Sequence, residues 1–237
     1  AYWYIGVNTK RKPLGQKPVR QALAQALDRK QIVQGAMFGQ GQVNQGPVPA
    51  SSRWAQNYAP YSGGVESAKA LLAKAGIPQG FETSLMVTTQ YPESVRIAQI
   101  LQAQLAQIGV KATIRTLEWA QWLDEEGKGN YDMYVLNWNA LVDPNDYYFA
   151  QHRTGQNFNF TGYSNPALDK LLDAGRTATS VPQRQGIYAK VNKLIVDDAP
   201  YIYLFNPLNV NAYSTKVKGY AARADQAINF TTTWLSK

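Results

Sequence analysis

The sequence contains no cysteine and a single histidine, His152. The absence of cysteine excludes disulfide bonds, thiolate chemistry and cysteine-based zinc sites, and one histidine excludes any site that needs two imidazoles. No apolar run approaches the roughly 18 residues that a membrane-spanning helix needs. Glycine-rich phosphate loops, a G-x-S-x-G nucleophile motif and an H-E-x-x-H zinc motif are also missing. The sequence therefore predicts no cofactor, no metal and no familiar catalytic centre.

What the chain does contain is the composition of a globular protein. Of its 237 residues, 45% are apolar and 17% are charged. This is too apolar for intrinsic disorder, and a chain of this length buries roughly 70% of its unfolded surface. Six tryptophans and fifteen tyrosines are more than a core of this size needs. Because aromatic side chains with a few polar groups often line concave ligand sites, we expect some of them at such a site.

The formal net charge of +8 is distributed unevenly along the chain. The first 60 residues hold most of the excess, with Asp28 as their only acidic residue and these basic ones: Lys10, Arg11, Lys12, Lys17, Arg20, Arg29, Lys30 and Arg53. A basic patch can bind nucleic acid or an anionic lipid surface, but no nucleic-acid-binding motif accompanies it. We expect a solvated basic face, with Arg20 in an ion pair or a helix cap. A polyanion-binding module remains an alternative, and no nucleic acid partner is predicted.

Hydrophobic periodicity and cap residues define the expected elements. The expected strands are 2–7, 82–87, 110–116, 131–137, 201–205, 208–213 and 217–220. The expected helices are 18–27, one capped by Asp28, 66–75, 92–108, 118–126, one opened by Asn165-Pro166 and one opened by Ser180 and Pro182. Residues 38–63 are rich in glycine, proline and amide side chains and are expected to form a long loop.

Strands and helices alternate between residues 82 and 137 with short connections. This β-α-β-α-β order predicts an α/β fold with a central, mainly parallel sheet flanked by helices. Ligands of open α/β sheets bind beyond the carboxyl ends of the strands. The segment that follows Asn137 is therefore the first place to look for a site.

Three acidic or histidine-containing segments have been considered for catalysis. His152 lies in a polar stretch that is interpreted as a turn, so a Ser-His-Asp site is not favoured. Asp124, Glu125 and Glu126 are neighbours on a helix and are expected to form a solvated charge run instead of a glycosidase pair. Asp197-Asp198 is interpreted as an exposed helix end instead of a metal site. We expect no enzyme, and a carboxylate-type hydrolase remains the enzymatic alternative.

Six segments, in order, resemble one known family. Residues 19–29 (VRQALAQALDR) resemble a VRQALAYAIDR stretch, and residues 67–76 (SAKALLAKAG) resemble AKALLAEAG. Glu118-Trp119 with residues 129–133 resembles EW…GDYD, and Trp138 with Asp143-Pro144 resembles W…DP. Residues 162–172 resemble GYSNPEVDKLL, and residues 217–220 resemble VKGF. Together these segments cover nearly the whole chain and are similar to the family 5 extracellular solute-binding proteins, the peptide- and nickel-type receptors of ABC importers.

The resemblance implies a two-lobed fold like that of periplasmic binding proteins, in which two α/β lobes close on a ligand. It implies that this chain is the C-terminal portion, with residues 1–205 as the distal ligand-binding lobe. Residues 206–237 are expected to return toward a missing N-terminal lobe of the same protein. The chain opens directly on a strand, which fits a processed protein or a piece of a longer one. Aromatic side chains that meet the first lobe are expected to be exposed.

The resemblance also suggests the ligand-binding residues. Trp119 and Trp138 match two tryptophans that line the pocket of oligopeptide-type members, and Asn137 and Asn139 flank the second of these. Peptide-binding members usually carry an aspartate three residues after the tryptophan that corresponds to Trp138. This chain has Leu141 at that position, so Asp143 is the candidate that could take the place of the aspartate. An arginine found in some members on the preceding strand is replaced by Val135. Peptide is the leading ligand class, and a sugar, an opine-like compound, another neutral polar solute or a metal complex remain open.

The implied activity is capture without catalysis. A ligand that contacts both lobes only in the closed state shifts the hinge equilibrium toward closure, and the ABC permease then recognises the closed form. The implied location is the periplasm or the extracellular face of the membrane, and a lipid anchor is possible in such a receptor.

Overall fold

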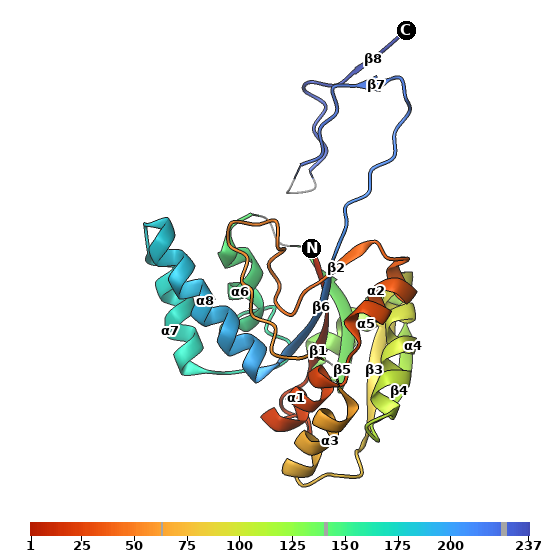
Figure 1. Cartoon of the computed structure of the whole chain (residues 1–237), viewed down its shortest axis with the longest axis vertical. Helices are drawn as coiled ribbons and strands as arrows, with labels where there is room; N and C mark the ends of the chain where they lie inside the picture. The colour runs from red at the N-terminus through yellow and green to blue at the C-terminus, as the bar shows by residue number, and fades with distance from the viewer. Residues whose placement is uncertain (63, 140–141, 224–226) are drawn as a thin grey trace.

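The computed structural model describes residues 1–62, 64–139, 142–223 and 227–237. Its centre is one six-stranded sheet with the strand order β2-β6-β1-β5-β3-β4. Helices cover both faces of this sheet, and the C-terminal segment extends beyond one edge (Figure 1). The elements, in chain order, are β1 (Tyr2–Val7), α1 (Lys17–Gln25), α2 (Arg29–Met37), β2 (Gly41–Val43), α3 (Val65–Lys74), β3 (Glu82–Thr88), α4 (Pro92–Ala106), β4 (Lys111–Leu117), α5 (Trp119–Lys128), β5 (Met133–Trp138), α6 (Pro144–His152), α7 (Pro166–Thr177), α8 (Val181–Asp198), β6 (Tyr201–Pro207), β7 (Val217–Lys218) and β8 (Trp234–Leu235).

The sheet is parallel over one half and antiparallel over the other. Strand β3 pairs in parallel with both β4 and β5, which confirms the β-α-β-α-β unit. Strand β1 runs antiparallel to both of its neighbours, β5 and β6, and β2 runs antiparallel to β6. The α/β class is confirmed, but the expectation of a mainly parallel sheet holds only for the β5-β3-β4 half. The amino end of β1 therefore lies at the same edge as the carboxyl ends of β5 and β6.

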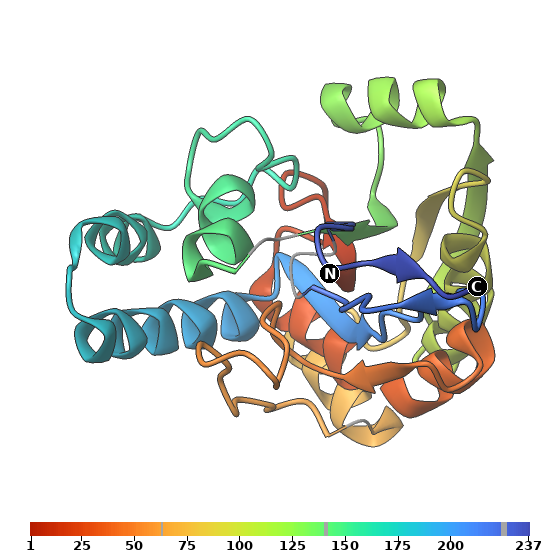
Figure 2. The same ribbon diagram turned by 90° about the horizontal axis from the view of Figure 1, so that it is seen from above.

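The two faces of the sheet have different chemistry. Side chains alternate along a strand, so β1 places Trp3, Ile5 and Val7 on one face and Tyr2 and Tyr4 on the other. Helices α1 to α4 cover the first face, which we call the aliphatic face. Helices α5 to α8 contribute to the opposite core, which we call the tyrosine face (Figure 2). Its tyrosines from the strands are Tyr2, Tyr4, Tyr134, Tyr201 and Tyr203.

Local signals explain most helix starts. The Asp28 carboxylate accepts a hydrogen bond from the Gln31 backbone N–H at 3.0 Å and caps α2, as expected. Asn165 and Ser180 cap α7 and α8 in the same way. Helix α6 is not among the elements expected from the sequence. In the structure Asp143 is its N-cap and Pro144 its first residue, a pair that suits a helix start.

Two further expectations are corrected. Residues 208–213 are not a strand, because no strand of the described chain pairs with them, and Leu208, Val210 and Tyr213 are exposed. His152 does not lie in a polar turn, because it ends α6 with none of its surface exposed. The loop at 38–63 also contains the short strand β2, which pairs with the carboxyl end of β6.

The C-terminal arm, residues 208–237, leaves the body after β6 and carries the small β7-β8 sheet (Figure 1). Its described part exposes several large apolar side chains. They are Leu208, Val210, Tyr213, Ile228, Phe230, Trp234 and Leu235. The aromatic ones, Tyr213, Phe230 and Trp234, are exposed as expected for side chains that would meet a first lobe, and that lobe itself stays a prediction.

Candidate functional site

A hollow of about 350 Å³ opens at the carboxyl end of β5, on the tyrosine face. This is the edge at which ligands of open α/β sheets bind. Elements far apart in sequence converge there: β1, the loop before α4, α5, the end of β5, α6 and the segment before α7. The lining residues are Tyr4, Tyr91, Trp119, Leu123, Glu126, Leu136, Asn137, Trp138, Asn139, Gln151, Phe158 and Phe160.

Neighbouring rings hold the two tryptophans of the hollow. Trp119 stacks on the buried Trp122 with ring centroids 5.3 Å apart, and Tyr91 meets it edge-on at 5.5 Å. Trp138 meets Phe158 edge-on at 5.2 Å, and its indole N–H donates to the Asp146 carbonyl at 3.3 Å. The rings are therefore positioned before any ligand arrives, and they present flat apolar faces to it.

The structure brings four of the five expected site residues together. Trp119, Trp138, Asn137 and Asn139 line the same hollow. Asp143 does not line it. Its carboxylate pairs with the Arg184 guanidinium at 2.7 and 2.9 Å and accepts from the Asn145 backbone N–H.

Arg184 also holds the pKa of Asp143 below its usual value, mainly through these hydrogen bonds. The Asp143 carboxylate is therefore already committed to a cation of this chain. Val135 lies in the aliphatic core and not in the hollow. Leu141, the position of the missing aspartate, lies outside the described residues.

Sequence reasoning missed Glu126, which lies in the hollow and is only 4% exposed. The expected solvated run of three acids is correct for Asp124, which is exposed and pairs with Lys128 at 2.6 Å; Glu125 is only partly exposed and pairs with Arg115 at 2.9 Å. The expectation is wrong for Glu126. The helical spacing from Trp119 through Leu123 to Glu126 places these three side chains on one face of α5, and that spacing was the available signal.

A buried polar network lies behind the hollow. The Gln151 amide donates to the Tyr4 hydroxyl at 3.0 Å and accepts from the Tyr2 hydroxyl at 2.5 Å. The next residue, His152, has its Nδ1 2.7 Å from the Tyr148 carbonyl and its Nε2 2.6 Å from the Tyr203 hydroxyl. Since a carbonyl only accepts, Nδ1 carries the proton and Nε2 accepts from Tyr203.

Burial lowers the pKa of His152 to about 4, so the ring is neutral at pH 7. Both ring nitrogens are occupied and no part of the side chain reaches solvent. His152 therefore acts as a structural hydrogen-bond partner behind the hollow and does not reach a ligand.

Burial has the opposite effect on the carboxyl group of Glu126. It raises the pKa of Glu126 to about 8, and the nearby Tyr134 hydroxyl counteracts this only in part. The Tyr134 hydroxyl and the Trp122 indole N–H are themselves buried, and within the described part of the chain neither has a hydrogen-bond partner of ordinary geometry. The hollow therefore has buried polar groups beside Glu126 that lack hydrogen-bond partners of ordinary geometry among the described residues.

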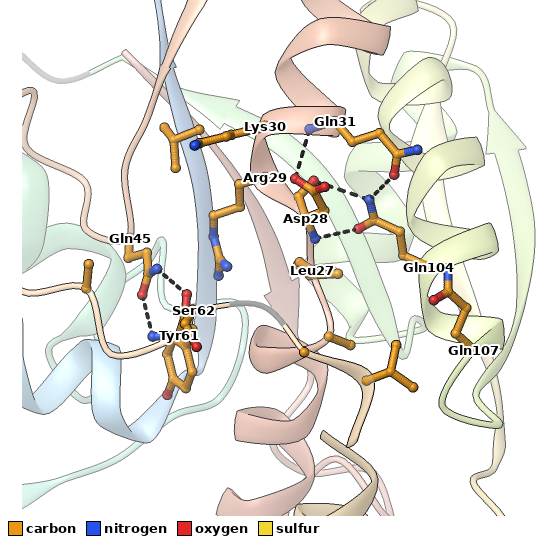
Figure 3. Close-up of a pocket in the computed structure, with 15 residues that line it drawn as sticks. Leu27, Asp28, Arg29, Lys30, Gln31, Gln45, Tyr61, Ser62, Gln104 and Gln107 are labelled. Atoms are coloured by element: carbon orange, nitrogen blue, oxygen red, sulfur yellow. Dashed lines mark hydrogen bonds between the residues drawn. The ribbon is translucent and has the colours of Figure 1, made fainter. Parts of the chain in front are cut away.

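A larger hollow of about 620 Å³ lies between α2, α4 and the 43–65 segment (Figure 3). Several of its polar groups bond to one another or to the backbone. The Gln104 side chain bonds to the backbone of Asp28 and to Gln31, and Gln45 bonds to the Tyr61 backbone in both directions. Arg29 is buried and donates to the carbonyls of Tyr203 and Ala24. We therefore take the aromatic hollow, and not this larger one, as the candidate ligand site.

The basic residues of the first 60 positions do not form one face. Arg20 and Arg29 are each only 5% exposed and donate to backbone carbonyls. Arg20 bonds to the carbonyl of Asp198 at the end of α8, which confirms its expected capping role. Asp198 is not simply an exposed helix end, because it accepts hydrogen bonds from Lys17, Tyr163 and Asn165.

Known proteins resemble this chain over almost its full length. A family model described as bacterial extracellular solute-binding proteins, family 5, middle region, matches residues 1–160. The glutathione-binding protein GsiB of Salmonella typhimurium is 32% identical over 96% of this chain, which corresponds to 46% of that protein. The chain thus spans about half the length of the curated relatives it matches.

Solved structures agree. The periplasmic binding protein DppA of Helicobacter pylori, in complex with the peptide STSA, matches all of this chain and 47% of its own with a TM-score of 0.88 and 28% identity. A dipeptide-binding protein from Pseudoalteromonas, in complex with Met-Leu, matches 99% of this chain and 48% of its own, with a TM-score of 0.85 and 26% identity. These relatives are binding proteins and not enzymes.

Proposed function

Since the chain belongs to the bacterial extracellular solute-binding proteins of family 5, we propose that it is the ligand-binding lobe of a receptor for an ABC importer. One observation carries this proposal. Trp119 and Trp138, from two separate elements, converge with Asn137 and Asn139 on one hollow at the carboxyl edge of the sheet. Rings held in place beside backbone and amide groups suit a small solute that has both apolar and polar parts.

The proposed solute is a peptide or a similar small polar molecule. The support is that the relatives described above are named for, or were solved with, glutathione, a tetrapeptide and a dipeptide. The mechanism is capture. The solute contacts the aromatic hollow on this lobe and a second lobe of the same protein, and closure follows because only the closed state offers both sets of contacts.

The C-terminal arm is proposed to pack against that second lobe. Its exposed apolar side chains, Phe230, Trp234 and Leu235 among them, form a surface that water disfavours. The length comparison supports the same arrangement, because each of these relatives is about twice as long as this chain. Residues 1–205 then form the distal lobe, and residues 206–237 form the connection back.

The proposed place of action is the outer side of the cytoplasmic membrane, where the permease receives the solute. In the described part of the chain, no helix is long and apolar enough to cross a bilayer. A hydrolase and a polyanion-binding module are the less favoured functions, since the relatives are binding proteins and two of the eight basic residues are buried.

Isothermal titration of this chain with glutathione, Met-Leu and Ser-Thr-Ser-Ala tests the proposal. We expect at least one to bind with a Kd of roughly 0.1–1 mM, since one lobe supplies only part of the contacts. Trp119→Ala is expected to weaken that binding at least tenfold, and the control Trp234→Ala, on the arm, to leave it unchanged. Equal losses in both variants, or no binding by any of the three, would contradict the proposed function.

A further inference from the structure

Glu126 is a buried carboxyl group in a ligand site, without a cation of its own. It lies on the face of α5 that also carries Trp119 and Leu123, and all three line the hollow. The acids beside it have partners, since Asp124 pairs with Lys128 and Glu125 with Arg115. Among the residues that the structure describes, Glu126 forms no ion pair. Burying a carboxylate without a counter-charge is costly unless the group takes up a proton or meets a cation.

Among the described residues, the titratable groups that interact electrostatically with Glu126 are tyrosines. They come from β1, the 129–132 turn, β5 and β6, and are Tyr4, Tyr131, Tyr134 and Tyr201. Burial raises the pKa of each of them above its ordinary value of 10, so they stay neutral at physiological pH. The positive charge of Arg11 partly counteracts the rise in the pKa of Tyr131. The Tyr134 hydroxyl is buried beside the carboxyl group and, among the described residues, has no hydrogen-bond partner of ordinary geometry.

The rest of the hollow suits a positive charge. Tyr91, Trp119, Trp138 and Phe158 contribute rings to its wall, and the faces of such rings attract ammonium and guanidinium groups. A buried carboxylate beside aromatic rings brings a charge partner and a set of π-faces to one hollow. Because the Glu126 carboxyl group is itself buried, its interaction with a cation is stronger than that of an exposed acid.

We propose that Glu126 is a specificity-determining residue that receives an ammonium or guanidinium group of the solute, with the aromatic rings enclosing the cation. This inference rests on the proposed function, because it names the substrate class of the same hollow. In this proposal the acidic partner of the cation comes from α5. It does not come from the segment after β5, in which Leu141 occupies the position where the resemblance leads us to expect an aspartate.

The proposal implies that binding and proton release are linked. With a pKa of about 8, Glu126 is mostly protonated at pH 7 in the empty lobe. A bound cation favours the carboxylate, so the proton leaves to solvent as the cation enters. The affinity for a cationic solute therefore rises between pH 6 and pH 8.5, and the affinity for a neutral solute does not.

Two small probes separate the effect of charge from that of shape. Phenethylammonium and phenethyl alcohol have the same phenethyl skeleton, but the first ends in an ammonium group and the second in a hydroxyl group. Their binding to this chain is followed by tryptophan fluorescence. At pH 8.5 we expect the cation to bind at least fivefold more tightly than the alcohol. At pH 6 the preference is expected to shrink at least fivefold, since little of Glu126 is then ionised.

Glu126→Gln is expected to abolish the preference at pH 8.5 and leave the affinity for the alcohol unchanged. The matched control is Glu125→Gln, which removes one acid from the same helix outside the hollow and is expected to change either affinity less than twofold. The pH series on the unmodified chain keeps the test valid if the glutamine variant fails to fold. Equal affinity for the two probes, a preference that survives in Glu126→Gln, a preference independent of pH, or no binding of the cation at tens of millimolar would each overturn the proposal.

The peptide titrations described above distinguish this failure from failure of the proposed function. If the solutes bind and the cation preference is absent, only the role of Glu126 is wrong. If the cation preference holds and no peptide binds, the cation subsite stands and peptide capture is wrong.

Discussion

The two faces of the same sheet do different work. On the aliphatic face, Ile5, Val135 and Leu204 are buried under α1 to α4 and have no polar groups to satisfy. On the tyrosine face, the alternate positions of the same strands carry hydroxyl groups that bond to Gln151 and His152. The aromatic hollow, our candidate ligand site, opens on this second face. Because successive side chains along a strand point to opposite faces, one sheet can have an apolar core on one face and a core with polar groups, beside the candidate site, on the other.

Tyrosine suits the ligand-facing side for a physical reason. Its ring buries as much apolar surface as a large aliphatic side chain, and its hydroxyl fixes orientation through a hydrogen bond. Tyr4 illustrates both roles, since its ring packs 5.0 Å from that of Tyr201 and its hydroxyl accepts from Gln151. The tyrosine face is therefore expected to be sensitive to shape and pH, and the aliphatic face mainly to loss of volume.

The largest effect is expected from Gly6→Ala. A Cβ at Gly6 would lie 2.2 Å from a ring carbon of Tyr134, which is fully buried and cannot move aside. We expect a loss of about 4 kcal/mol in the free energy of unfolding, measured by urea denaturation. The control is Gly127→Ala on α5, where an added Cβ would meet no neighbouring group within 4 Å. This variant is expected to gain about 0.5–1 kcal/mol in the free energy of unfolding. A stable Gly6→Ala would show that the tyrosine face is loosely packed.

Leu204→Ala tests the aliphatic face. Leu204 is fully buried there, and its truncation is expected to cost about 3 kcal/mol through lost burial and a residual cavity. Solute affinity per folded molecule is expected to stay unchanged. Tyr203→Phe, one residue earlier on the other face, removes only the hydroxyl that donates to His152 and is expected to cost about 1 kcal/mol. A loss of solute affinity in Leu204→Ala would break the separation between the two faces.

Glu126→Gln is expected to stabilise the protein only at higher pH. The folded state raises the pKa of Glu126 from 4.5 to about 8, so it holds a proton that the unfolded chain releases in this range. Stability therefore falls as the pH rises from about 4.5 to about 8. A shift of this size corresponds to at most about 5 kcal/mol, and relaxation around the hollow reduces it to roughly 2.

Melting temperatures measured from pH 4.5 to 8.5 test this. Glu126→Gln and the unmodified chain are expected to agree at the acid end and to diverge progressively as the pH rises from about 4.5 to about 8, with the variant more stable. The control Glu125→Gln is expected to show no such divergence. A constant difference across the whole range would mean that Glu126 titrates normally.

Asp143→Asn is expected to have the smallest effect. Asparagine keeps the helix cap of α6 and loses the ion pair with Arg184, which is partly exposed to solvent. We expect a loss of about 0.5–1 kcal/mol in the free energy of unfolding and an unchanged affinity for phenethylammonium. A clear loss of affinity would return Asp143 to the ligand site, as the sequence alone suggested.

Local signals made much of this fold predictable. Caps such as Asp28 and Asn165 and the alternation of strands and helices from 82 to 137 placed most elements, and the edge rule for parallel strands then brought Trp119 and Trp138 together. The pairing of β1 with β5 and β6 was not predictable, because it joins segments more than 100 residues apart. The expected strand at residues 208–213 likewise does not form because, in the described part of the chain, no strand lies beside it.

The site was predictable only where a motif marked it. Glu126 follows the acids Asp124 and Glu125 and looks like them in sequence, and only its position on the helical face of α5 turns its side chain inward. Asp143 shows the reverse case, since its motif suggested a ligand role and the structure pairs it with Arg184, 41 residues later. Such pairings depend on tertiary contacts that one sequence does not reveal.

The central claim is that the solute binds on the tyrosine face, and the six tryptophans report on it directly. Their indole N–H signals are recorded by NMR, assigned by single Trp→Phe variants, while glutathione, Met-Leu or phenethylammonium is added. The account predicts shifts of Trp119, Trp122 and Trp138, with Trp3 on the aliphatic face and Trp234 on the arm unchanged. Shifts at Trp3 or Trp234 with Trp119 and Trp138 silent, or no shift at all, would contradict it.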